Sequence, residues 1–218
     1  MTRSSLSRIA PTLALAAGSL LIATRLVSLV TIPANSAAMQ ALVLGPIHAV
    51  NSLLTLFGFA LLAFVLVAVH DWQASAAARF GVVALGAALV GTVIMTGDWW
   101  FEAFAVPWLA DVSPGALDAV GGRLMIGGFA SFVVFGVGWV LFAIASLRAH
   151  VYPARISGLI LVGGALSGVT IGGAYLLGGI VLGAALVWLG RWSHAASRTG
   201  NPDPASATEG KVEFSFVK

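Results

Sequence analysis

The sequence predicts an all-α, polytopic transmembrane helix bundle of about six spans, and three features of the chain indicate this fold class. Of the 218 residues, 59% are hydrophobic and only 9% are charged, whereas soluble domains carry about 25% charged residues. The apolar residues form runs that reach the roughly 20 residues a helix needs to cross a bilayer. The arginines lie mainly at the ends of these runs, where they act as topology signals.

Five apolar runs follow one another along the chain, and the last is too long for one ordinary span. Because it contains Gly172 and Gly173 near its middle, we expect two short helices, over 156–171 and 174–189, joined by a tight turn. A single tilted helix with a re-entrant segment is the alternative. The five runs cover residues 9–32, 41–69, 80–97, 124–147 and 156–189.

The chain divides into a transmembrane bundle over residues 1–193 and a cytoplasmic tail over residues 194–218. The tail is rich in small polar residues and proline, a composition typical of disorder. Placing the N-terminus in the cytoplasm puts nearly all basic residues inside, and it puts the acidic segment 98–122 outside. This asymmetry predicts an even number of spans with both termini cytoplasmic. A cleaved signal peptide is disfavoured because Arg25 interrupts the first run.

Two parts of the chain share a glycine pattern. The spacing of Gly81, Gly86 and Gly91 recurs in the fifth helix, at Gly158, Gly163 and Gly168. The pattern predicts that the second and third helices repeat as the fourth and fifth, as in some transporters. Chance matching between apolar helices of similar composition is the alternative.

The most informative polar stretch follows the third run. Asp98 and Glu102 are four residues apart, so a continuing helix places them on one face. Trp99, Trp100 and Trp108 are of the residue type that lies at the headgroup interface. One interpretation is an outer aromatic belt with two solvated carboxylates. The other is the mouth of a cavity, where the carboxylates bind a cation or exchange protons.

Several polar residues fall at a similar depth in the outer leaflet. Because a charge within the bilayer costs several kcal/mol unless it is paired or hydrated, we expect Arg25 to pair with Asp98 or Glu102. Alternatively, Arg25 extends its side chain to the outer headgroups, while the histidine and asparagine of the second helix make structural hydrogen bonds. The predicted binding residues are Arg25, His48, Asn51, Asp98, Trp99, Glu102 and Arg123.

Composition also excludes several classes of site. The absence of cysteine rules out disulfides and thiolate metal sites. We expect no metal and no cofactor, since only His48 is intramembrane and haem would need two facing histidines. The chain has no basic patch with interleaved aromatic residues, so nucleic-acid binding is not expected. The small-residue faces are expected to be packing surfaces or contacts of a homo- or hetero-oligomer, and they contain Gly164, Gly168, Gly172, Gly179 and Gly183.

Two segments, residues 102–110 around Pro107 and residues 139–155 around Tyr152 and Pro153, resemble an uncharacterised group of small multi-pass membrane proteins from actinobacteria and related bacteria. The resemblance implies a bacterial plasma-membrane protein and transfers no catalytic residue.

Three classes of function remain open. The first is binding or transport of a small lipophilic molecule or ion through the outer polar site. The second is a non-catalytic scaffold or accessory subunit. The third is a membrane-embedded cyclase or isomerase of a lipophilic substrate, with Asp98 or Glu102 as the general acid.

Overall fold

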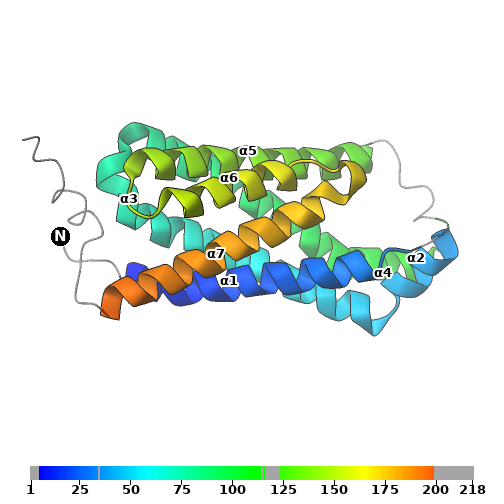
Figure 1. Cartoon of the computed structure of the whole chain (residues 1–218). Coiled ribbons are helices and arrows are strands. Elements are labelled where there is room, and N and C mark those ends of the chain that lie inside the picture. The colour runs from blue at the N-terminus through cyan, green and yellow to red at the C-terminus, as the bar shows by residue number, and fades with distance from the viewer. Residues whose placement is uncertain (1–4, 34, 114, 116–122, 199–218) are drawn as a thin grey trace, which may run out of the picture.

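Helices form the whole framework of the chain in this computed structural model, which describes residues 5–33, 35–113, 115 and 123–198. The predicted all-α class is confirmed, because no strand occurs among these residues. The helices run side by side along one long axis (Figure 1). They are α1 (Ser5–Val30), α2 (Ser36–Val43), α3 (Pro46–Trp100), α4 (Val106–Val112), α5 (Arg123–Ala149), α6 (Ala154–Ser167) and α7 (Ala174–Arg198), with a π-helical turn η1 (Phe101–Ala105) and a 3-10 turn η3 (Ile171–Gly173).

Helix α3 reverses direction and forms two antiparallel passes. Its 55 residues would extend about 80 Å if straight. Instead, the rings of Phe59 and Trp99 stack with centroids 6.3 Å apart. The reversal falls between two apolar stretches, Pro46–Ala74 and Arg79–Val112 (Figure 1). The segment between the predicted second and third spans is therefore a helical bend within α3, and its polar residues lie in that bend.

Five stretches are long and apolar enough to cross a membrane, and a sixth is shorter. Helix α6 has 14 residues, about 21 Å, which is less than the roughly 30 Å hydrocarbon core. The predicted split of the run at 156–189 is confirmed. Gly173 has φ of 75°, a backbone conformation that glycine adopts without strain. However, α6 ends at Ser167, before the predicted boundary at residue 171.

The other predicted boundaries also shift. The second predicted run begins at residue 41, but α3 begins at Pro46, a residue suited to the first turn of a helix. The chain beyond residue 97 remains helical as far as Val112 through η1 and α4. Helix α7 continues to Arg198, so residues 194–198, assigned to the tail, are helical. Residues 199–218 lie outside the described part of the chain.

The helices form a closed ring around one core. Helix α1 packs between α7 and α3, α5 packs between α3 and α6, and α6 packs against α7. Buried side chains from these helices fill the centre, among them Leu62, Leu66, Trp139, Phe142, Ile160 and Leu182. Many large apolar side chains on the outside are exposed, including Phe57, Val82, Val93, Ile126 and Val137. An apolar outer surface around a filled core is the arrangement expected of a protein in a lipid bilayer.

The glycine-rich faces are used within the chain. A side chain at Gly183 would collide with the Gly18 carbonyl of α1, and one at Gly164 would collide with Trp139 of α5. These faces therefore bring helices of one chain together. The repeat stays a prediction, because Gly91 lies inside α3 whereas its counterpart Gly168 caps the end of α6.

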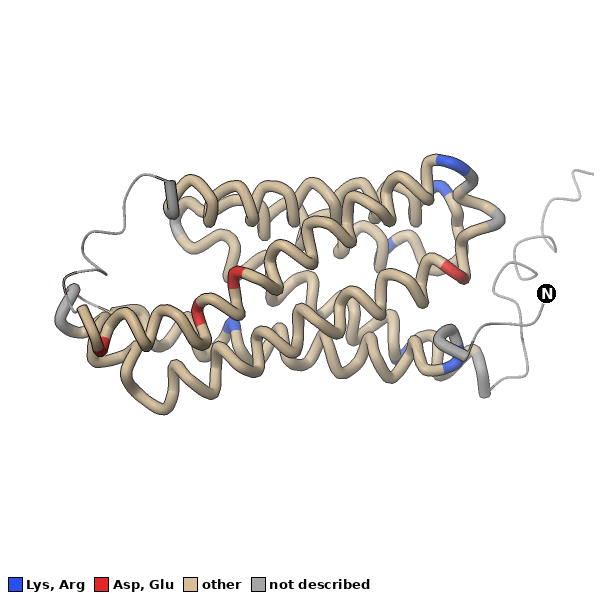
Figure 2. Tube along the Cα trace, turned by 180° about the vertical axis from the view of Figure 1, so that it is seen from behind, with Lys and Arg blue, Asp and Glu red and all other residues tan. Residues whose placement is uncertain are grey.

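Charge is distributed unevenly between the two ends of the bundle. Helix α1 begins and α7 ends at the same end (Figure 1). Most basic positions lie at this terminal end, whereas most acidic positions lie in the opposite half (Figure 2). We call the two regions the basic end and the acidic half.

Candidate functional site

Arg25 lies inside the helix ring, in the acidic half of the bundle. Its side chain is only 2% exposed, so it does not extend to the headgroups. The expected ion pair is also absent: no contact joins its guanidinium to the carboxylate of Asp98 or Glu102. Its Nη1 atom is buried and has no hydrogen-bond partner among the described residues. Within the described part of the chain, the structure therefore holds a positive charge in an apolar interior without a neutralising carboxylate.

Aromatic rings take the place of the expected carboxylate. The Cζ atom of Arg25 lies 4.5 Å from the centroid of the Trp99 ring and 5.6 Å from that of Phe59. A cation over an aromatic face is attracted by the ring quadrupole, by about 2 kcal/mol when the pair is desolvated. The reversal of α3 brings the two rings together, so the hairpin itself builds this contact.

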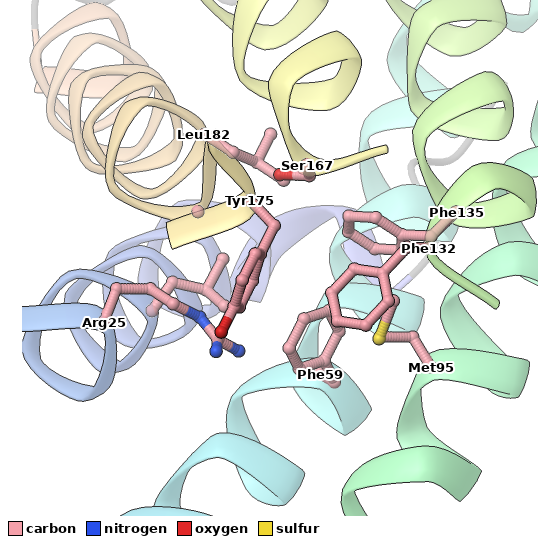
Figure 3. Close-up of a pocket in the computed structure, with 10 residues that line it drawn as sticks. Arg25, Phe59, Met95, Phe132, Phe135, Ser167, Tyr175 and Leu182 are labelled. Atoms are coloured by element: carbon pink, nitrogen blue, oxygen red, sulfur yellow. The ribbon is translucent and has the colours of Figure 1, made fainter. Parts of the chain in front are cut away.

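A small pocket adjoins the guanidinium, and every helix of the ring contributes to its wall. The cavity has a volume of about 10 Å³, counted as positions open to the centre of a water molecule. This is room for about one water. Ser167 and Tyr175 are among the lining residues, and the Tyr175 hydroxyl points toward the guanidinium (Figure 3). The remaining lining residues are Leu21, Phe59, Met95, Phe132, Phe135, Gly179 and Leu182.

Gly179 makes room for the Arg25 side chain. A Cβ atom at this position would lie 2.8 Å from Cγ of Arg25 and 3.2 Å from its Cδ and Nε. The stem of the arginine therefore crosses the face of α7 where a side chain is missing. Close helix contact at small residues is common in membrane proteins, and here it positions a charged group.

His48 and Glu102 meet through the backbone of the π-helical turn. The Val106 N–H donates to the Phe101 carbonyl, and Pro107 has no N–H to offer to the Glu102 carbonyl. His48 Nε2 lies 3.1 Å from that carbonyl oxygen. Because the oxygen can only accept, Nε2 carries the proton and donates. His48 thus supplies the hydrogen bond that the helix cannot, which is the structural role considered for it.

The other predicted site residues lie around this contact. Asn51 Nδ2 donates to Ser28 Oγ at 3.2 Å and links α3 to α1. The Asp98 carboxylate lies beside the hydroxyl of Ser131 in α5. Neither Asp98 nor Glu102 lines the pocket of Arg25. Arg123 begins α5, and its side chain lies outside the described part. Trp100 and Trp108 are exposed, as an outer aromatic belt requires.

Of the residues that line the pocket, sequence reasoning predicted only Arg25; those it missed include Phe59, Ser167, Tyr175 and Gly179. Tyr175 carried a usable signal, since it follows the predicted glycine turn and so falls in the same leaflet as Arg25. Phe59 carried none, because one phenylalanine in an apolar span looks like any other.

The described residues contain no group of three or more histidine, aspartate or glutamate side chains that could hold a metal ion. Comparison of the chain with protein-family models, curated proteins and solved structures finds no match. The function is therefore inferred from the geometry of this site.

Proposed function

We propose that this multi-pass membrane protein binds a small anionic ligand at Arg25, within the acidic half of the bundle. The observation that carries the proposal is the buried Nη1 atom of Arg25, which has no hydrogen-bond partner in the described part of the chain, beside a small cavity that Ser167 and Tyr175 help to line. A buried charge normally has a partner or is hydrated. An anion supplies the missing charge, and the cavity gives it a place.

Binding fits the surroundings of Arg25 better than the alternative functions do. The enzyme interpretation needs a substrate cavity at Asp98 or Glu102, and the pocket is lined by neither. Transport needs a continuing aqueous path, whereas Trp139 and Phe142 fill the core toward the basic end. A pure scaffold gains nothing from a buried unpaired charge, which costs several kcal/mol.

We also infer that both termini are cytoplasmic and that the membrane is a bacterial plasma membrane. The concentration of arginines at the basic end supports the orientation, and the resemblance of residues 102–110 and 139–155 to small actinobacterial membrane proteins supports the location. The site then lies on the outer-leaflet side of the membrane. Because the glycine faces pack within the chain, oligomerisation is not part of this proposal.

Thermal unfolding of the detergent-solubilised protein tests the proposal. The protein is heated at constant ionic strength in sodium gluconate with increasing amounts of halide, nitrate, sulfate or an alkyl carboxylate. A ligand that binds only the folded state at 100 times its dissociation constant stabilises it by about 2.7 kcal/mol. We expect at least one anion to raise Tm in the native protein and to have no effect in Arg25→Gln.

Arg148→Gln is the matched control, because Arg148 also lies over an aromatic ring, Phe80, but is exposed. It should keep the response to the anion. Equal responses in Arg25→Gln and the native protein would contradict the proposal, as would the absence of a response to every anion tested.

A further inference from the structure

We infer that the ligand at Arg25 is a single desolvated monovalent anion of halide size, an inference that rests on the proposed function. Size is the first argument. The cavity accepts about one water-sized group. A halide fits such a space, whereas sulfate or phosphate would need several side chains to move. The walls contributed by Phe132, Phe135 and Leu182 are buried or half-buried within the ring of helices, so little room for adjustment exists.

Hydrogen-bond donors are the second argument. The free Nη1 of Arg25 provides a charged donor, and the hydroxyls of Tyr175 and Ser167 line the same cavity. Figure 3 shows the Tyr175 hydroxyl directed at the guanidinium. A halide accepts from Nη1 and has no donor of its own that must be satisfied. Water could also fill the cavity, but it would leave the charge of Arg25 uncompensated.

Charge balance is the third argument. One monovalent anion neutralises the single cation of the pocket. A divalent anion would leave a net negative charge among apolar side chains. The site should therefore discriminate by charge as well as by size.

Trp99 provides a built-in reporter for the test, since its ring lies 4.5 Å from Cζ of Arg25. Bromide quenches tryptophan fluorescence on contact. The experiment titrates sodium bromide into the full-length protein in nanodiscs at constant ionic strength and records tryptophan emission. We expect a saturable quenching component above the linear collisional background. Chloride, which quenches weakly, should compete for that component, and sulfate should not.

Variants assign the saturable component to the pocket. Trp99→Phe should remove it. Arg25→Gln should weaken bromide binding at least about tenfold, because hydrogen bonds to a charged group contribute about 1.5–3 kcal/mol. Gly179→Ala should also weaken it by displacing the arginine stem. Gly86→Ala is the matched control, since a Cβ atom there meets nothing within 4 Å, and it should bind bromide like the native protein.

Chloride-dependent thermal unfolding of the native protein keeps the inference testable if a variant does not fold. Linear quenching together with a Tm that does not respond to chloride would overturn it. If decanoate stabilises the native protein but not Arg25→Gln while halides have no effect, the halide inference fails and the anion site at Arg25 stands. If neither halide nor carboxylate acts through Arg25, both proposals fail.

Discussion

Arg25 costs the folded protein stability, and this cost is the main reason to assign it a function. Its contacts with Trp99 and Phe59 contribute about 2 kcal/mol. Burying an ion without a hydrogen-bonded counter-ion costs several kcal/mol. The rings therefore offset only part of the penalty. A side chain that merely packed at this position would be more favourable if it were apolar.

Arg25→Met should therefore increase the free energy of unfolding of the ligand-free protein by about 1–4 kcal/mol, the range seen when buried ionic groups are replaced by apolar ones. Unfolding by SDS in mixed micelles, in gluconate buffer, measures the change. The control Arg148→Met makes the same chemical change at an exposed site and should stay within about 1 kcal/mol. Destabilisation by more than about 2 kcal/mol would show that the arginine is structural.

The helices that carry Arg25, His48 and Asn51 could be predicted from the sequence, whereas the partners of these side chains could not. The helices follow from the apolar runs. Partners depend on which helix faces meet, and in a bilayer both the inward and the outward face of a helix are apolar. Nothing in the pattern therefore indicated that Phe59 and Trp99 would enclose Arg25 in place of a carboxylate.

At the scale of the elements, two local breaks shape the site. The turn at Gly172 and Gly173 was predictable, because paired glycines interrupt a run too long for one span. The π-helical turn η1 was not, although Pro107 in the sequence is its cause. Of the two interpretations given for the segment around Pro107, the aromatic belt fits Trp100 and Trp108 but not the half-buried Trp99. The π-helical turn is also the kind of irregularity often found at functional sites.

The interpretation of η1 predicts energetic coupling between Pro107 and His48. Pro107→Ala restores a backbone N–H, so the Glu102 carbonyl no longer depends on His48. His48→Ala should then cost about 0.5–1.5 kcal/mol less in the Pro107→Ala background than in the native one. A double-mutant cycle of unfolding free energies measures this difference.

Asn51→Ala is the control for this cycle, because its hydrogen bond goes to Ser28 on α1. Its effect should add to that of Pro107→Ala. Equal costs of His48→Ala in the two backgrounds would mean that the histidine does not compensate for the proline.

For the whole molecule, the distribution of charge determines the expected orientation. Apart from Arg123, which begins α5 at the opposite end, the described arginines at helix ends lie at the basic end, and Arg25 is separate from them within the first span. The even number of passes follows from the hairpin in α3 and the short helix α6. Together they return the end of α7 to the side where α1 begins (Figure 1).

Because the chain has no cysteine, single-cysteine labelling can test the orientation without background. Asp111 and His150 are both exposed, and they lie near opposite ends of the bundle. A membrane-impermeant maleimide added to intact cells should label Asp111→Cys and leave His150→Cys unlabelled until the cells are permeabilised. The reverse labelling pattern would invert the topology.

An experimental density map of the protein in lipid nanodiscs, prepared in chloride or bromide buffer, would show whether an anion occupies the site at Arg25. We expect density for an anion within hydrogen-bonding distance of Arg25 Nη1, in the cavity bounded by Tyr175 and Ser167, and its loss in Arg25→Gln. A guanidinium paired with the carboxylate of Asp98 or Glu102, or extended to the outer headgroups, would rule out the anion site.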